Sequence, residues 1–87
     1  MKDIYGLVKT VIISEPSNPD AGYKYDIYRD EGGESDHWHV QPSVQKAVAT
    51  NEGLHHVWVR LSSKVFPGSK ELEDIISECG IHFRENT

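Results

Sequence analysis

The sequence predicts an α+β fold, a two-layer sandwich in which two helices cover one face of a mainly antiparallel sheet of about four strands. Three observations indicate it. Several segments have the alternation or β-branched composition of strands, two segments carry one apolar stripe at helical spacing, and polar loops separate them. The predicted order is β-β-β-α-β-α. We expect a single domain over residues 1–87, because a chain of this length buries only one modest core.

The first predicted strand runs from about Leu7 to Ser14. Its run Val11-Ile12-Ile13 is β-branched throughout, which is typical of a central strand buried on both faces. The segment Pro16–Gly22 follows, and its two prolines and final glycine predict a loop.

The next two strands form a predicted hairpin. In Tyr23–Arg29, the residues Tyr23, Tyr25 and Ile27 fall on one face and alternate with Lys24, Asp26 and Tyr28, which is the period of a half-buried strand. Asp30–Asp36 contains two adjacent glycines that take a positive φ without steric cost, so it is predicted to be the hairpin loop. His37–Val40 is then the returning strand.

A short helix is predicted from Val44 to about Thr50. Ser43 is a suitable N-cap, the apolar residues recur at i, i+3 and i+4, and Gly53 is placed to end the helix. Leu54–Leu61, which comes next, has the strongest strand signal in the chain.

The second predicted helix runs from Lys70 to Cys79. From Leu72 onward its apolar residues recur at i, i+3, i+4 and i+7, and acidic residues lie near its N-terminus, where the helix dipole favours them. Gly80 is a suitable C-cap, and Ile81-His82-Phe83 is a candidate for one last short strand.

The composition narrows the classes of function. The formal net charge is −5, with 14 acids against 9 bases, which argues against a nucleic-acid-binding module and against binding to an anionic membrane surface. No apolar run approaches the roughly 20 residues of a membrane span, and residues 1–4 lack the hydrophobic segment of a secretory signal. A single cysteine suits a reducing compartment, so we expect a cytoplasmic protein.

Catalytic signatures are missing from the sequence. Gly-x-Ser-x-Gly is absent, and no glycine-rich phosphate loop occurs. Cys79 and His82 are close in sequence, but the thiol completes the apolar stripe at the C-terminal end of a helix, where the dipole disfavours a thiolate. We therefore expect a non-enzymatic protein without a cofactor.

Four of the five histidines fall in two clusters, each with a tryptophan: His37 and His39 around Trp38, and His55 and His56 before Trp58. Strand alternation places His37 and His39 on one face, and it places His56 on the less buried face of its own strand. If those strands are neighbours, the three imidazoles could bind zinc or copper. Surface histidines beside tryptophans are the favoured interpretation, because no established zinc spacing occurs.

The predicted hairpin loop is acidic and has aromatic neighbours. Five acids and one base lie between Asp26 and Asp36. Tyrosine and tryptophan are good interface anchors, and carboxylates around them suit a basic partner surface. A solvated loop tip with ordinary strand tyrosines explains these residues about equally well. The predicted partner-binding residues are Tyr25, Tyr28, Asp30, Glu31, Glu34, Asp36, Trp38 and Trp58.

Together these patterns favour a small acidic, non-enzymatic protein-binding domain. The expected partner is a protein with a basic surface, as for an inhibitor or immunity-type protein that occludes the basic site of a nuclease or another nucleic-acid-processing protein. One alternative is a metal-binding or pH-responsive module built on the histidine clusters. Another is a self-associating structural protein that buries the same aromatics in a homodimer.

Overall fold

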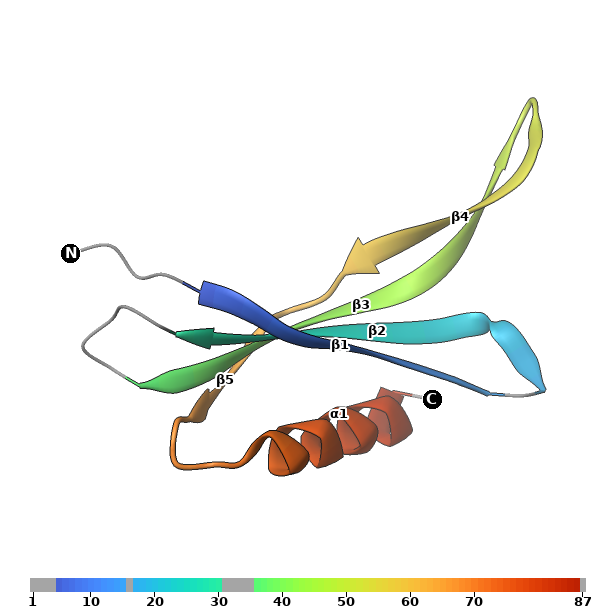
Figure 1. Cartoon of the computed structure of the whole chain (residues 1–87). Coiled ribbons are helices and arrows are strands. Elements are labelled where there is room, and N and C mark those ends of the chain that lie inside the picture. The colour runs from blue at the N-terminus through green and yellow to red at the C-terminus, as the bar shows by residue number, and fades with distance from the viewer. Residues whose placement is uncertain (1–4, 16, 31–35, 87) are drawn as a thin grey trace.

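The computed structural model describes residues 5–15, 17–30 and 36–86. In this part of the chain, five strands precede one helix (Figure 1). The elements are β1 (Tyr5–Glu15), β2 (Asn18–Asp30), β3 (His37–Thr50), β4 (Gly53–Arg60), β5 (Lys64–Pro67) and α1 (Leu72–Asn86). No helix of these residues is long and apolar enough to cross a membrane.

The strands form one antiparallel sheet in the order β1-β2-β3-β4, with β5 also paired to β3. Along one edge of β3, residues 43–50 pair with β4 and residues 37–40 pair with β5, while β2 pairs with the opposite edge. β4 and β5 are therefore two pieces of one interrupted edge strand. Gln41 supports the interruption, because its Nε2 donates to the backbone oxygens of Leu61 (2.8 Å) and Pro42 (2.9 Å).

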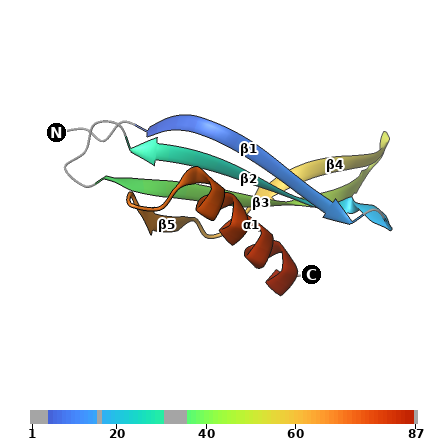
Figure 2. The same ribbon diagram turned by 60° about the horizontal axis from the view of Figure 1, so that its bottom comes forward.

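One helix covers one face of this sheet (Figure 2). The core consists of side chains from β2, β3 and α1: Tyr25, Ile27, Trp38, Val40, Ile75, Cys79 and Phe83. The apolar alternation predicted for β2 is confirmed, since Tyr25 and Ile27 are buried under the helix. The α+β class is also confirmed in its coarse form, with one helix in place of the two that were predicted.

The helix predicted over residues 44–50 is wrong, because these residues are the second half of β3. The predicted helical stripe is Val44, Ala47 and Val48, but Val44 and Val48 share one face of a strand as readily as one side of a helix, so the pattern alone is ambiguous. A seven-residue helix is also marginal by itself, whereas each of these residues pairs with a residue of β4 in the antiparallel ladder. Gly53, with a φ of 125°, makes the turn into β4.

The short final strand is wrong too, since α1 continues through Gly80 to Asn86. A glycine inside a helix costs about 1 kcal/mol relative to alanine. Burying Phe83 against the sheet contributes roughly 2–3 kcal/mol, which outweighs that cost and keeps the last turns helical. Phe83 thus extends the stripe that begins at Leu72.

β1 corrects a third prediction, because it is an edge strand and is not buried on both faces. Val11 and Ile13 pack against the core, but Ile12 points away from the helix and is 62% exposed. The register of β1 against β2 shifts between Leu7 and Lys9 and again between Ile13 and Glu15. The loop predicted over residues 16–22 is shorter than expected, because β2 already begins at Asn18.

Candidate functional site

The face of the sheet opposite α1 carries a group of polar and aromatic side chains; we call it the helix-free face. Strand pairing places residues from β2, β3 and β4 side by side on it. Its members in these strands include Lys24, Asp26, Tyr28, His39, Gln41, Ser43, Trp58 and Arg60. Charged groups of both signs and two large aromatics therefore share one surface.

Three residues predicted to bind a partner lie inside the protein. Tyr25 is 1% exposed and Trp38 is 8% exposed, both beneath α1, and the Asp30 side chain is buried as well. The indole Nε1 of Trp38 donates to the backbone oxygen of Lys70 at 2.8 Å, which fixes the start of α1 against the sheet. These side chains stabilise the fold and are covered by it, so a partner cannot contact them in this structure.

The acidic loop is described only at its ends. Asp36 is exposed and forms an ion pair with Arg29, with 2.6 Å between Oδ1 and Nη2. Asp30 lies near the ring of His37, with 3.5 Å between Oδ2 and Nδ1. Glu31 and Glu34, the other two predicted contact residues, lie outside the described residues.

Tyr28 and Trp58 are the predicted anchors that remain accessible. Trp58 is 38% exposed on the helix-free face, with Nζ of Lys24 lying 5.1 Å from its ring centroid. Tyr28 is half-buried and packs edge-on against its cross-strand partner His39, with ring centroids 6.4 Å apart. Both aromatics thus combine accessibility with a cationic or imidazole neighbour.

A hollow of about 240 Å³ opens on this face between Tyr28, His39, Gln41 and Arg60. Arg60 is the last residue of β4, where the chain leaves the sheet toward the interruption at residues 61–63. Neither a hydrogen bond nor an ion pair joins its guanidinium to the described residues. The hollow is therefore lined by Tyr28, His39, Gln41 and an arginine that has no ion-pair partner among the described residues.

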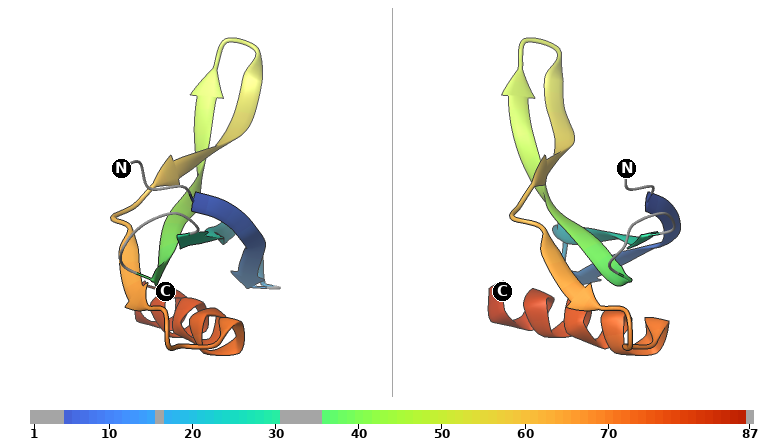
Figure 3. Two further views of the ribbon diagram at one scale, coloured as in Figure 1. Left: turned by 60° about the vertical axis from the view of Figure 1, so that its left-hand side comes forward. Right: turned by 90° about the vertical axis from the view of Figure 1, so that its left-hand side faces the viewer.

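Residues 45–58 form a hairpin that projects beyond the rest of the sheet; we call it the arm (Figure 3). The pairing of β2 with β3 ends at Val44, while β3 and β4 remain paired to Thr50 and Gly53. The molecule measures 48 × 27 × 17 Å and its radius of gyration is 15.0 Å. A compact chain of this length has a radius of gyration of about 12 Å, so the arm makes the fold elongated.

Large apolar side chains are exposed along the arm and at its base: Val48, Leu54, Val57, Trp58 and Val59. Leu54, at 64%, is the most exposed of them. A two-stranded ribbon is only marginally stable in water without a third layer against it. The register places Val48, Val57 and Val59 on one face of this ribbon and Leu54 and Trp58 on the other, and no third strand or helix packs on the arm among the described residues.

The three histidines of the metal alternative do not converge. His39 lines the hollow, whereas His56 pairs with Ala47 on the arm. Eight positions of β3 separate His39 from Ala47, which corresponds to about 26 Å along a strand. Among the described residues, no group of three or more His, Cys, Asp or Glu side chains could hold a metal ion.

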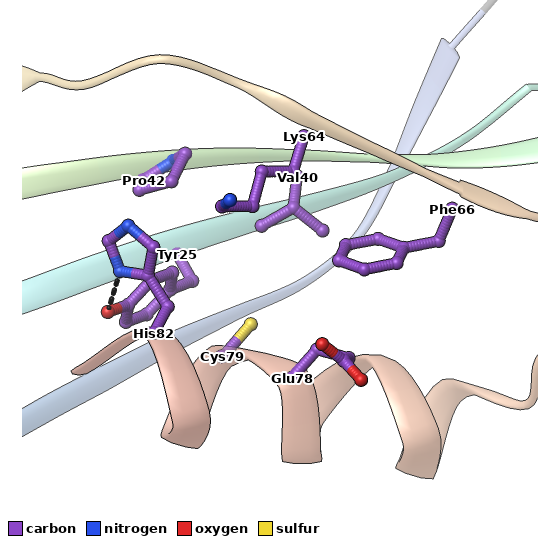
Figure 4. Close-up of a pocket in the computed structure, with 8 residues that line it drawn as sticks. All are labelled: Tyr25, Val40, Pro42, Lys64, Phe66, Glu78, Cys79 and His82. Atoms are coloured by element: carbon purple, nitrogen blue, oxygen red, sulfur yellow. Dashed lines mark hydrogen bonds between the residues drawn. The ribbon is translucent and has the colours of Figure 1, made fainter. Parts of the chain in front are cut away.

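A hydrogen bond under α1 joins the sheet to the helix, with 2.9 Å between the Tyr25 hydroxyl and Nδ1 of His82 (Figure 4). Burial raises the pKa of Tyr25 far above its ordinary value. Burial also lowers the pKa of His82, and the positive charge of nearby Lys64 lowers it further. Burial also raises the pKa of Cys79 to about 11. Tyr25, Cys79 and His82 all line an adjoining cavity of about 10 Å³, which has room for a single water at most.

Sequence reasoning missed both the arm and the hollow. The arm was hidden because its first strand was assigned to a helix, which would have placed residues 44–50 over the sheet. Nothing in the sequence pairs Arg60 with Tyr28. That neighbourhood depends on the register of β2, β3 and β4.

Similarity to known proteins adds no residue role to this surface. No protein-family model matches the chain, and comparisons with curated proteins and with solved structures find no match either. The roles of the arm and of the hollow are therefore inferred from the geometry and chemistry of their own residues.

Proposed function

We propose that this chain is a non-enzymatic protein-binding domain that docks on a different protein through its arm and the adjoining helix-free face. The observation that carries the proposal is the exposure of five large apolar side chains on and beside a two-stranded projection. Exposed apolar groups gathered on one element favour an interface, and single scattered ones do not. Trp58 is the expected central anchor, because tryptophan contributes disproportionately to binding energy.

Charge supports a partner with a basic surface. α1 carries Glu73, Asp74, Glu78 and Glu85 against Arg84 alone, so its outer surface is acidic. Glu31 and Glu34, which are predicted to contact the partner, would add two more negative charges. The negative electrostatic field of these acids accelerates association with a basic protein. An inhibitor or immunity-type domain that occludes a basic site requires this.

The first test is the state of the isolated protein in solution. Light scattering at 10–100 µM (roughly 0.1–1 mg/ml) is expected to give the mass of one chain, because the proposed partner is a different protein. A concentration-dependent dimer that dissociates in Val57→Ser would overturn the proposal in favour of self-association through the arm.

The second test compares binding by matched variants. Val57→Ser and Trp58→Ser are expected to weaken binding to a captured partner by roughly tenfold or more, because buried anchors are typically worth over 1 kcal/mol. Ile81→Ser, at an exposed position of α1, is the control and is expected to bind like the wild type. Equal binding by all three variants would overturn the role of the arm.

A basic partner surface has its own test. Reversing Glu31 and Glu34 to lysine is expected to slow association and to flatten its dependence on salt, with little change in dissociation. Unchanged association rates would remove the basic partner from the proposal while leaving the arm as the docking element.

A further inference from the structure

We propose that the hollow on the helix-free face is a binding site for a carboxylate group, with Arg60 as its anchor. Arginine is the side chain best suited to carboxylates, because its fork of N–H groups matches the two oxygens. Arg60 lines the hollow, and its guanidinium makes no ion pair or side-chain hydrogen bond within the described residues. An incoming anion therefore meets a donor group that no acid among the described residues neutralises.

The hollow is built by the fold and is held by hydrogen bonds. Nε2 of Gln41 binds the backbone oxygens of Pro42 and Leu61, and the backbone N–H of Leu61 donates to the oxygen of Pro42 at 2.9 Å. These bonds fix the place where β4 ends, immediately after Arg60. The anchor is thus attached to ordered backbone, which lowers the entropy cost of binding.

The opposite wall supplies an aromatic edge and a second polar group. Tyr28 and His39 are cross-strand partners that pack edge-on at 6.4 Å between ring centroids. A phenol O–H and an imidazole N–H both donate to anionic oxygens. The wall can therefore contact the body of an organic acid while Arg60 holds its charged end.

The local charge favours a singly charged ligand. Asp26 is the cross-strand partner of Gln41, and its Oδ1 accepts a hydrogen bond from Thr10 at 2.8 Å. That carboxylate beside the hollow opposes a dianion such as phosphate, whereas one arginine matches one carboxylate. The volume of about 240 Å³ is below the usual range of small-molecule pockets, which suits an acidic side chain or a small organic acid.

This inference goes beyond the proposed function, because it depends only on the hollow and can be tested without any partner. The probe is benzoate, with benzamide as its neutral isostere and phenylphosphonate as the dianion. In titrations of ¹⁵N-labelled protein, benzoate is expected to shift the amide signals of Tyr28, His39, Gln41 and Arg60 saturably, with a dissociation constant of roughly 1 mM. Benzamide is expected to cause no saturable shift.

Variants identify the anchor. Arg60→Gln is expected to weaken benzoate binding about tenfold or more, and Arg60→Lys is expected to restore part of it, because charge returns without the fork. Arg84→Gln, at an exposed position of α1, is the matched control and is expected to bind like the wild type. Binding by Arg60→Gln at wild-type strength, equal binding of benzamide, or tighter binding of phenylphosphonate would each overturn the proposal.

A peptide distinguishes the two sources of a carboxylate. An acetylated and amidated pentapeptide with one central glutamate and four alanines carries a single protein-type acid. If it shifts the same signals with an affinity near that of benzoate, the site accepts a partner's side chain. If benzoate alone binds, the ligand is a small free acid. The failure of every acid to bind would overturn the site and leave the arm's docking role untouched.

Discussion

The guanidinium carbon of Arg29 lies 4.5 Å from the ring centroid of Trp38, so a cation covers the indole that begins β3. The same arginine donates from Nη1 to the backbone oxygen of Gly68 at 3.2 Å and pairs with Asp36. One half-buried side chain therefore connects β2, β3 and the turn that leads from β5 into α1. This turn determines where the only helix of the described residues begins.

Replacing Arg29 tests how much that connection stabilises the protein. Arg29→Gln is expected to lower the free energy of unfolding by roughly 1–2 kcal/mol, since it removes a cation–π contact and charged hydrogen bonds that are partly shielded from water. Urea denaturation measures the change. Arg84→Gln, exposed on α1, is expected to stay within about 0.5 kcal/mol of the wild type. Equal losses in both variants would contradict a special role for Arg29.

Two glycines give opposite predictions for the same substitution. A Cβ on Gly68 would lie 2.5 Å from the backbone oxygen of Asp36, and a Cβ on Gly80 would meet nothing within 4 Å. Gly68→Ala is expected to destabilise the protein by roughly 1–3 kcal/mol through this clash. Gly80→Ala is expected to stabilise it by up to about 1 kcal/mol, because alanine is the better helix former. Thermal unfolding of both variants provides the comparison, and a stabilising Gly68→Ala would show that the turn can move aside.

His82 predicts a loss of stability in acid. Its pKa is lowered in the folded protein by burial and by Lys64, so the unfolded chain takes up a proton more readily. The stability that His82 contributes is complete at pH values above its ordinary pKa of about 6.5. It is lost as the pH falls toward the lower pKa of His82 in the folded protein. The free energy of unfolding is therefore expected to fall from pH 7.5 to about pH 5.

A comparison with His82→Gln isolates this residue from the other four histidines. The variant is expected to be less stable at pH 7.5, because the bond to Tyr25 is altered, and to lose less stability on acidification. Urea denaturation at the two pH values gives both slopes. Parallel pH profiles for the wild type and the variant would assign the acid sensitivity to other groups.

Cys79 is expected to resist thiol reagents in the folded protein. Its pKa of about 11 lies two units above the ordinary 9.0, which lowers the thiolate fraction near neutral pH about 100-fold, and its side chain is covered by the sheet. Reaction with Ellman's reagent at pH 7.5 is expected to be at least that much slower in buffer than in concentrated urea. Similar rates in the two solvents would indicate frequent opening of α1.

Local pattern predicted the strands whose two faces differ most in chemistry. Tyr25 and Ile27 alternate with polar neighbours, and this alternation corresponds to the face that α1 covers. The stripe of the last helix was predicted from Leu72 to Cys79 and continues to Phe83. In these elements the hydrophobic period and the observed packing agree, because one face of each is buried.

Segments that are exposed on both faces carry no hydrophobic period from which their structure could be predicted. Residues 46–58 of the arm are all exposed, so burial imposes no period on them and their short apolar stripe resembles that of a helix. Val11-Ile12-Ile13 looks like a central strand, although Ile12 points into solvent. Tyr25 and Trp38 were placed in the binding surface because composition does not reveal which face a helix will cover.

Among the described residues no strand pairs with the outer edge of β1, so this edge could template another strand, with exposed Ile12 beside it. The two shifts in register, near Leu7–Lys9 and Ile13–Glu15, limit the regular part of this strand to residues 9–13. Irregularities of this kind twist an edge away from flat stacking, and Lys9 adds a charge that a stacked copy would repel. The irregular pairing of β1 thus protects the sheet against growth into a fibre, and straightening it is expected to convert a soluble edge into an aggregation site.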